Sequence, residues 1–227
     1  MNKKTTFPKS IGIILDGNRR WARERGLPTL EGHRKGLENF VTIAKHAQKV
    51  GMEHLVVYAF STENWNRTKE EVEYLMNLFR EMFSEKLDEL KEENMRVRVI
   101  GQKERFDSDL QEIIKKSEED TKNAIGLNVW IALSYGGRAE IAQAVSVACK
   151  EGDISEESIA KNMWSAGMPD PDIVVRPGGE RRISNFLIWQ IAYSELFFVD
   201  KYWPAFTTDD FDAILKEYEQ RERRRGK

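Results

Sequence analysis

The residues best suited to chemistry in this chain follow a short apolar run at positions 173–175. Arg176 ends the run, two glycines form a turn at positions 178 and 179, and Arg182 and Ser184 come next. Guanidinium groups bind phosphate oxygens in pairs, and glycine lets backbone N–H groups approach a ligand closely. The serine hydroxyl adds a neutral donor at the expected start of a helix. The pattern predicts a site for a small polyanion, a diphosphate above all; the alternative is a solvated, charged loop.

A second segment, near the N-terminus, has a similar design. The apolar run 11–15 is followed by a carboxylate, a turn and a basic helix start, Asp16-Gly17-Asn18-Arg19-Arg20. Backbone N–H groups at a helix start favour an anion. A carboxylate beside that anion is unfavourable unless a cation joins the two, and Mg²⁺ binds carboxylate and diphosphate oxygens together. Asp16 is therefore a candidate magnesium ligand, and its alternative role is to cap the following helix.

The elements that must position these segments follow from the hydrophobic pattern, in which short apolar runs alternate with longer segments of helical period. Strands are expected at 11–15, 54–60, 96–100, 127–133, 172–176 and 195–199. Helices are expected at 32–50, 69–93, 105–125, 138–151, 155–166, 184–191 and 209–224. This alternation predicts an α/β fold with a mostly parallel, six-stranded sheet flanked by helices, and its ligands should bind beyond the carboxyl ends of the strands. Both anion-binding segments, and the polar residues 61–67, follow such ends.

Composition limits the class of protein. The chain has 227 residues, of which 40% are hydrophobic and 33% are charged, and its net charge is −2. A single globular domain, residues 1–227, without general attraction to nucleic acid fits these values. The one cysteine, Cys149, excludes a disulfide framework and a cysteine-based zinc site, and we expect it in the core. Neither a signal peptide nor a membrane-spanning run is found, so a cytoplasmic location is expected.

Two further regions have more than one interpretation. The segment 73–90 carries large apolar residues, much of them on one helical face, which either pack in the core or line an apolar tunnel with a polar mouth. The basic end of the chain, residues 221–227, is a solvated tail, a contact for nucleic acid or membrane, or an arm that reaches a partner subunit.

Five separated motifs lie between about residue 11 and the basic end of the chain. They are Asp16-Gly-Asn-Arg-Arg-Trp-Ala, Gly32-His33, Tyr58-Ala-Phe-Ser-Thr-Glu-Asn-Trp-Asn-Arg67, Tyr135-Gly-Gly-Arg138, and the stretch from Arg176 through Ser184-Asn-Phe-Leu to Glu195. In this order they resemble the cis-prenyltransferases, most closely the bacterial undecaprenyl diphosphate synthases. The usual pattern differs at three positions: Pro177 replaces a threonine, Ser134 an asparagine, and Thr29 a frequent arginine.

The resemblance implies an Mg²⁺-dependent transferase that joins isopentenyl diphosphate to an allylic diphosphate, with farnesyl diphosphate expected as the primer. The product would be a Z-polyprenyl diphosphate such as undecaprenyl diphosphate, the lipid carrier precursor for cell-wall glycan synthesis. A homodimer is also implied. At the expected cytoplasmic location we further expect peripheral contact at the inner face of the membrane, and the charge balance predicts no nucleic-acid partner. The alternatives are a short- or medium-chain synthase and a non-catalytic partner subunit.

The resemblance also assigns roles to matching residues. Asp16 would be catalytic and would share Mg²⁺ with Glu195, while Asn64 would position a group or relay a proton, since an amide is a poor base. The allylic diphosphate would be held by Gly17, Asn18, Arg19 and Arg20, with Trp21 and His33 close by. The loop over the substrates would contain Ser61, Thr62, Glu63, Trp65 and Arg67. Isopentenyl diphosphate would be held by Arg176, Arg182 and Ser184, with Ile183 among the substrate-binding residues.

Overall fold

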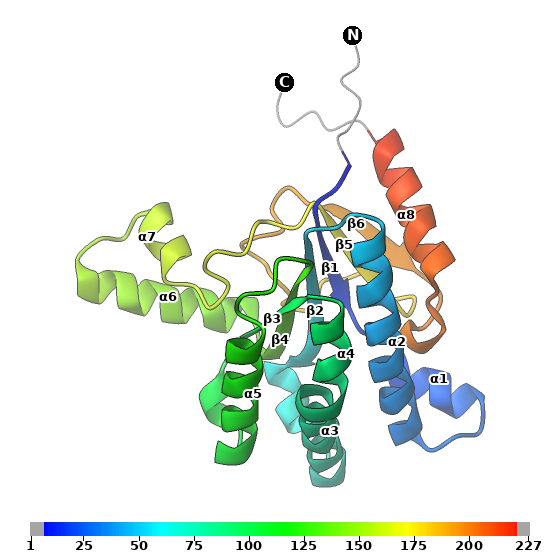
Figure 1. Ribbon diagram of the computed structural model, residues 1–227. Coiled ribbons are helices and arrows are strands. Elements are labelled where there is room, and N and C mark those ends of the chain that lie inside the picture. Colours follow the sequence, from blue (N-terminus) through cyan, green and yellow to red (C-terminus); the bar gives the residue numbers. More distant parts are fainter. Residues whose placement is uncertain (1–6, 222–227) are drawn as a thin grey trace.

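Six parallel strands form the centre of the molecule (Figure 1). The computed structural model describes residues 7–221. The strands are β1 (Ser10–Ile14), β2 (His54–Ser61), β3 (Arg96–Ile100), β4 (Asn128–Tyr135), β5 (Ile173–Pro177) and β6 (Glu195–Val199), in the sheet order β3-β4-β2-β1-β5-β6. The predicted strands are therefore confirmed, and the sheet is parallel throughout. The chain crosses to the far side of β1 between β4 and β5, so β1 and β5 flank the crevice in which parallel sheets bind ligands.

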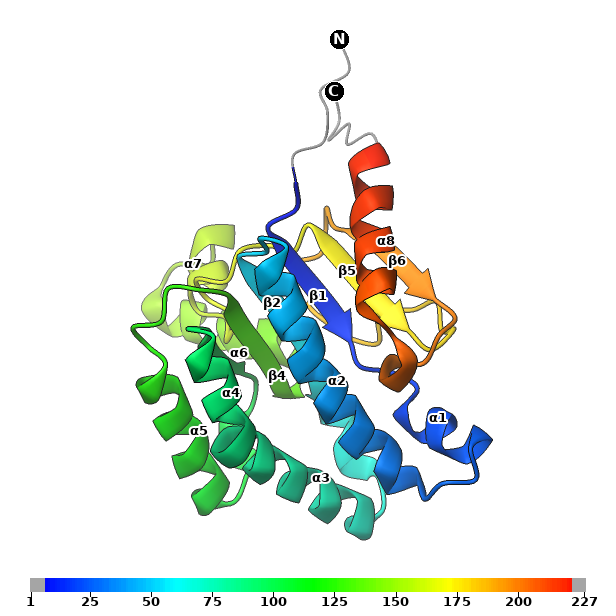
Figure 2. The same ribbon diagram turned by 45° about the vertical axis from the view of Figure 1, so that its right-hand side comes forward.

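Helices cover one face of the sheet and enclose the larger core (Figure 2). They are α2 (Thr29–Lys49), α3 (Lys69–Glu81), α4 (Leu87–Glu92), α5 (Ser108–Asp120) and α8 (Thr208–Gln220). The short α1 (Asn18–Glu24) projects beside the start of α2 (Figure 1). Within residues 7–221, none of the helices is both long and apolar enough to cross a bilayer.

The helix expected at 69–93 is interrupted by a π-helical turn at Met82–Lys86. Figure 2 shows the direction of the helix changing between α3 and α4. An extra residue in the turn bends a helix and shifts its faces. Both Met82 and Phe83 are buried here, so the turn directs two adjacent large side chains toward the sheet.

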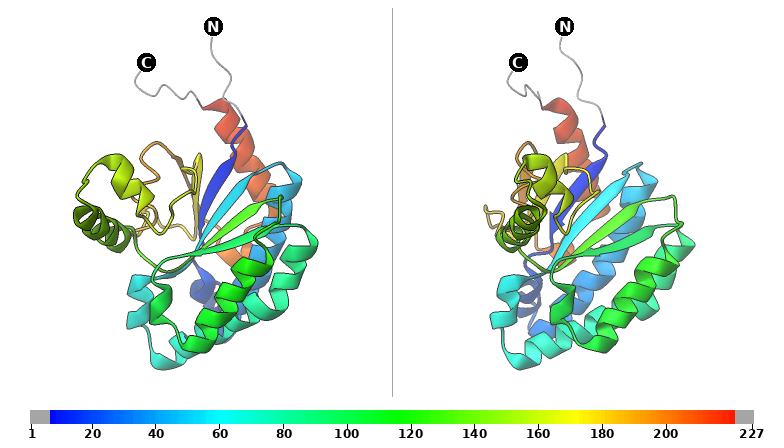
Figure 3. Two further views of the ribbon diagram at one scale, coloured as in Figure 1. Left: turned by 60° about the vertical axis from the view of Figure 1, so that its left-hand side comes forward. Right: turned by 90° about the vertical axis from the view of Figure 1, so that its left-hand side faces the viewer.

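The other face of the sheet is covered largely by irregular chain, with α6 (Gly137–Glu151) and α7 (Glu156–Lys161) outside it (Figure 3). The helix expected at 184–191 is wrong, because Ser184, Asn185 and Leu187 have positive φ angles of 46°, 66° and 45°. Cys149 is exposed rather than buried, since α6 turns Ala144 and Ala148 inward.

The β3 edge of the sheet is closed by side chains of the α5 region. The backbone N–H of Val97 donates to Thr121 Oγ1 (3.1 Å), and that of Val99 donates to Glu118 Oε1 (2.8 Å). These bonds satisfy donors that would otherwise attract another strand.

Candidate active site

Asp16 and Arg176 meet at the carboxyl ends of the neighbouring strands β1 and β5. Asp16 Oδ2 accepts hydrogen bonds from Arg176 Nη2 (2.8 Å) and Nε (3.2 Å). Asp16 Oδ1 accepts the N–H of Gly17 (2.6 Å) and lies 3.2 Å from Arg20 Nη2. Arg176 is only 6% exposed. One carboxylate therefore lies between two guanidinium groups, at the edge where ligands bind.

Arg176 also organises the loop that follows β5. Its Nη1 donates to the Arg182 carbonyl and to Ser184 Oγ, the latter at 2.7 Å. Ser184 is thus held by an arginine and does not cap a helix, contrary to the prediction. Gly178 is required because its φ is +104° and a Cβ there would lie 3.1 Å from Arg20 Nη2.

The first turn of α1 forms a basic basin of about 300 Å³ beside Asp16. Gly17 precedes the helix with φ +93°, and a Cβ at this position would lie 2.5 Å from the Tyr202 ring. The basin is lined by Leu15, Asp16, Gly17, Asn18, Arg19, Arg20, Arg23, His33 and Arg67. Its excess of guanidinium groups favours a polyanion.

A partly buried network joins α1 and α2 to the start of α3. Glu71 Oε1 lies 2.9 Å from Arg67 Nη1 and 3.3 Å from His33 Nε2, and Glu71 Oε2 lies 3.3 Å from Arg19 Nη1. Burial, followed by the charge of Arg67, lowers the pKa of His33 to about 4. His33 is therefore neutral near pH 7.

Glu71 was missed by the sequence reasoning, although a signal for it existed. Thr68 caps α3 by accepting the Glu71 N–H, and Glu71 stands one helical turn after Arg67. The spacing of Thr68 and Glu71 is that of a capping box, and Arg67 and Glu71 have ion-pair spacing.

The turn η1 (Thr62–Asn66) presents Asn64 to a polar pocket. Asn64 Oδ1 accepts the Ser61 N–H (3.0 Å), so the amide oxygen is already occupied. This geometry favours positioning over proton abstraction for Asn64. Asn185, also missed from the sequence, donates to Glu63 Oε1 (3.0 Å) and accepts the Arg138 N–H (2.9 Å).

The polar pocket has a volume of about 500 Å³ and lies next to the basic basin. It brings together residues from β1, α1, α2, β2, η1, α3, β5 and the segment after β5. Its walls are Ile14, Leu15, Asp16, Asn18, His33, Tyr58, Ala59, Ser61, Glu63, Asn64, Arg67, Leu75, Arg176, Ser184 and Asn185. Nine of these were predicted as site residues: eight from the three polar segments of the sequence, and His33.

Comparison with known proteins decides the family. The family model described as "Putative undecaprenyl diphosphate synthase" matches residues 14–226. The chain belongs to this family. The isoprenyl transferase of Neisseria gonorrhoeae is 44% identical over 225 residues, covering 98% of this chain and 91% of the relative. The isoprenyl transferase of Bacillus anthracis is 44% identical over 232 residues, covering 99% and 90%.

Two solved structures have the same fold over nearly the whole chain. Lavandulyl diphosphate synthase from Lavandula x intermedia, in complex with dimethylallyl diphosphate, has a TM-score of 0.93 at 31% identity and covers 97% of this chain and 99% of its own. A probable undecaprenyl diphosphate synthase from Campylobacter jejuni has a TM-score of 0.85 at 31% identity, with 98% and 100% covered. The protein is accordingly a prenyltransferase, and its family is generally Mg²⁺-dependent.

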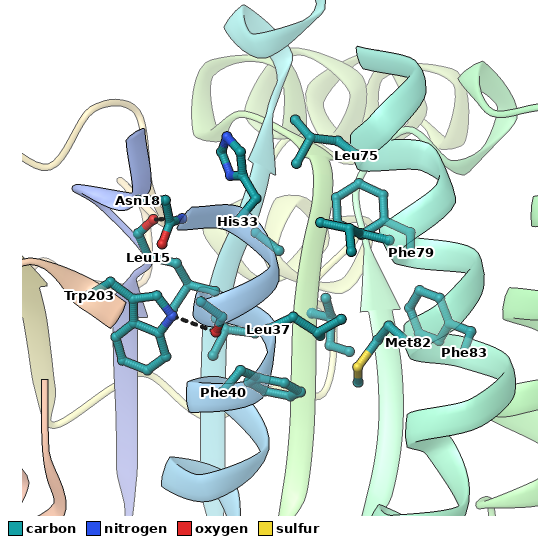
Figure 4. A pocket seen from close by; sticks show the side chains of 15 residues that line it. Leu15, Asn18, His33, Leu37, Phe40, Leu75, Phe79, Met82, Phe83 and Trp203 are labelled. Carbon is teal, nitrogen blue, oxygen red and sulfur yellow. Dashed lines mark hydrogen bonds between the residues drawn. The ribbon is translucent and has the colours of Figure 1, made fainter. Parts of the chain in front are cut away.

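An apolar cavity of this prenyltransferase lies directly behind the polar pocket, between α2 and α3 (Figure 4). Leu15, Asn18, His33, Ala59 and Leu75 line both spaces. Figure 4 shows His33 and Leu75 at one end of the cavity, and Phe40, Met82 and Phe83 toward the other. Its volume is about 70 Å³, whereas a cavity of roughly 150 Å³ holds benzene. A cavity of this size does not show the predicted tunnel, which remains a prediction.

Several predicted substrate contacts of the enzyme lie away from the pocket. Trp21 stacks against Arg25, whose guanidinium carbon is 4.6 Å from the ring centroid. Trp65 lines a groove on the outer side of η1. The remaining three also lie outside the walls of the polar pocket. Thr62 faces Gly136, the partly buried Ile183 packs against the smaller core on the other face of the sheet, and the exposed Arg182 pairs with Glu180.

The two carboxylates expected to share Mg²⁺ lie at opposite ends of the parallel strands: Asp16 follows the C-terminal end of β1, and Glu195 is at the N-terminal end of β6. Glu195 begins β6, in register with Ile173 and hence with Ile11, whereas Asp16 lies five residues beyond Ile11. This separation amounts to roughly 16 Å along the strands. Glu195 instead pairs with Arg221 (2.8 Å). The prediction of a second metal ligand is thus not met within one chain.

Of the two predicted metal ligands, Asp16 remains a candidate in the prenyltransferase site. Residues 7–221 contain no group of three or more histidine, cysteine or acidic side chains placed to hold a metal ion. Mg²⁺ commonly binds one or two protein carboxylates and completes its shell with substrate phosphates and water. Asp16, which lines both the basic basin and the diphosphate-sized polar pocket, fits that mode.

Proposed function

We propose that the enzyme condenses isopentenyl diphosphate onto an allylic diphosphate and forms a Z-prenyl diphosphate. The observation that carries this proposal is the position of Asp16. Its carboxylate lies between Arg176 and Arg20, in a polar pocket that shares a wall with an apolar cavity. A substrate with an anionic head and an apolar chain matches both spaces.

The charges divide into two groups that suit two diphosphates. Arg19, Arg20 and Arg67 line the basin at the start of α1 and are assigned to the allylic substrate. Arg176 and Ser184, with Arg182 at the rim, are assigned to isopentenyl diphosphate. These donors offset the repulsion between the diphosphates and hold the reacting carbons together. Mg²⁺ bound at Asp16 would supply charge neutralisation for the departing diphosphate.

The primer and the product length belong to this proposal. We assign farnesyl diphosphate as the primer and a medium-long product of the undecaprenyl type, since the named relatives are isoprenyl transferases and a similar structure is a probable undecaprenyl diphosphate synthase. A shorter product is the alternative, favoured by the small cavity and by the likeness to lavandulyl diphosphate synthase. The long product requires the cavity to widen, and the bent α3–α4 wall is where we place this movement.

The test uses purified enzyme with Mg²⁺, isopentenyl diphosphate and one primer at a time: dimethylallyl, geranyl or farnesyl diphosphate. Mass spectrometry gives the chain length, and NMR of the product gives the geometry of each new double bond. Z-configured products starting from farnesyl diphosphate are expected. The absence of product from every primer would favour the non-catalytic subunit, and E-configured products would reject the proposed reaction.

We propose a homodimer in the cytoplasm, in peripheral contact with the inner face of the membrane. Light scattering of the purified enzyme and co-sedimentation with vesicles test these two points. Most of the basic end of the chain, residues 222–227, lies outside the described residues, so its proposed arm-like contact with a partner subunit rests on the sequence.

A further inference from the structure

Ser134 is held in an unusual backbone conformation beside the active site. It is the penultimate residue of β4, it is 0% exposed, and its φ is +47°. Left-handed conformations are costly for residues other than glycine and asparagine, and they persist where the surrounding structure imposes them. The fold thus imposes this conformation on Ser134, and the contacts of its buried side chain show what the conformation positions.

The hydroxyl of Ser134 contacts a single tryptophan. Ser134 Oγ accepts the indole N–H of Trp65 at 2.9 Å. Phe60 and Phe106 pack against the same indole, with ring centroids 5.0 Å and 5.7 Å away, and the Arg105 guanidinium lies over it at 4.8 Å. The aromatic and cationic contacts confine the ring, while the hydrogen bond to Ser134 fixes its rotation.

Trp65 links Ser134 to the residues that face the substrate. It is the penultimate residue of η1, directly after Asn64 and two residues before Arg67. Asn64 and Arg67 line the polar pocket, whereas the Trp65 ring lines the outer groove. The bond between Asn64 Oδ1 and the Ser61 N–H makes η1 a compact unit, so rotation of Trp65 would shift both pocket residues.

We propose that Ser134 is a positioning residue whose hydroxyl fixes Trp65 and thereby sets Asn64 and Arg67 against the substrates. This inference rests on the proposed function of the same site. The competing role is a turn residue that acts through its backbone, because the Ser134 carbonyl accepts the Gln102 N–H at 3.2 Å.

Two substitutions separate the hydroxyl from the backbone. Ser134→Ala removes the acceptor and keeps the strained φ, whereas Ser134→Gly removes the acceptor and relieves the strain. If the hydroxyl matters, both should lower kcat/KM about tenfold, the effect of losing one well-placed hydrogen bond. Trp65→Phe removes the donor instead, and combined with Ser134→Ala it should be no worse than either change alone. Ser165→Ala, at a buried serine whose hydroxyl accepts a hydrogen bond from the Gln190 amide, should keep wild-type kinetics.

A second measurement follows the contact without requiring turnover. The indole N–H signal of Trp65 in a ¹⁵N spectrum is identified by its loss in Trp65→Phe. In Ser134→Ala this proton should shift and exchange faster with water, while that of Trp203, which donates to the Gly36 carbonyl, should not change.

The role of Ser134 and the proposed function of the site are rejected by different results. Normal kcat/KM in Ser134→Ala, recovery of activity in Ser134→Gly, additive losses in the double variant, or an unchanged Trp65 signal would each overturn the role of Ser134. An inactive wild-type enzyme would reject the proposed function instead, and the indole signal would still test the contact.

Discussion

Replacing Asp16 with asparagine removes one charge from the centre of the site and keeps its shape. The Asp16 side chain is 26% exposed and that of Arg176 is 7% exposed. Breaking a fully buried ion pair costs several kcal/mol, but solvent reaches Asp16, so we expect a loss of about 2 kcal/mol in the free energy of unfolding. Arg176 would then lose its Asp16 counter-charge, whereas Arg20 would keep Glu180, whose Oε1 lies 3.5 Å from Arg20 Nη1.

The expected loss of activity in Asp16→Asn is much larger than the loss of stability. The variant lacks the only protein carboxylate assigned to Mg²⁺, and an electrostatic contact made in the transition state contributes about 4 kcal/mol, or roughly a thousandfold in kcat. Added Mg²⁺ should not restore turnover. Product formation measured across a magnesium titration, together with urea unfolding, gives both quantities on the same preparation.

A carboxylate at the amino ends of the strands, opposite the site, serves as the control. Asp172 Oδ2 accepts the backbone N–H groups of Lys9 (2.9 Å) and Ser10 (3.3 Å), so Asp172→Asn should lower stability without a large change in turnover. If Asp16→Asn retains turnover within about tenfold of the wild type, the electrostatic reasoning for this site is refuted.

Three further outcomes are expected. The pKa of His33 is lowered to about 4, chiefly by burial. As the pH falls below about 6.5, the unfolded chain therefore binds a proton at His33 that the folded chain does not bind. His33 then has no effect on stability above that pH, and stability falls by up to about 3 kcal/mol as the pH drops toward 4. Urea unfolding of His33→Gln should lack this slope, and an equal slope would assign it to other groups. Arg182→Ala should raise the KM for isopentenyl diphosphate about tenfold through loss of a charged hydrogen bond, and an unchanged KM in steady-state assays would contradict its role. Met82→Ala enlarges the apolar cavity and should shift products toward greater length by mass spectrometry, whereas Met52→Ala, elsewhere in the same core, should not.

The sheet and much of the pocket were predictable because they depend on local patterns. Each strand is a short apolar run between polar segments, and parallel strands bring their carboxyl ends to one edge. Asp16, Arg67 and Arg176, far apart in sequence, could therefore be placed together. The same rule explains why Glu195 does not join them: it is the first residue of a strand and therefore lies at the amino end of the sheet, opposite the site.

The remaining features depend on tertiary contacts that outweigh local preference. The segment 184–191 is apolar and helix-like in sequence, yet Asn185 bonds to Glu63 and to the start of α6 instead. The direction of Trp65 was also hidden, since an aromatic residue in a polar loop fits either side of that loop. In the structure the Trp65 ring bonds to Ser134 and packs against Phe106, so it points away from the substrate pocket.

The π-helical turn at Met82–Lys86 gives the cavity wall an adjustable register. Such a turn holds one residue more than the α-helical turn that it replaces. Deleting that residue would rotate the chain on one side of the turn by about 100° relative to the other and change which side chains face the sheet. Insertions and deletions at this single place can therefore reshape the space for a growing product, while the strands that carry Asp16 and Arg176 stay as they are.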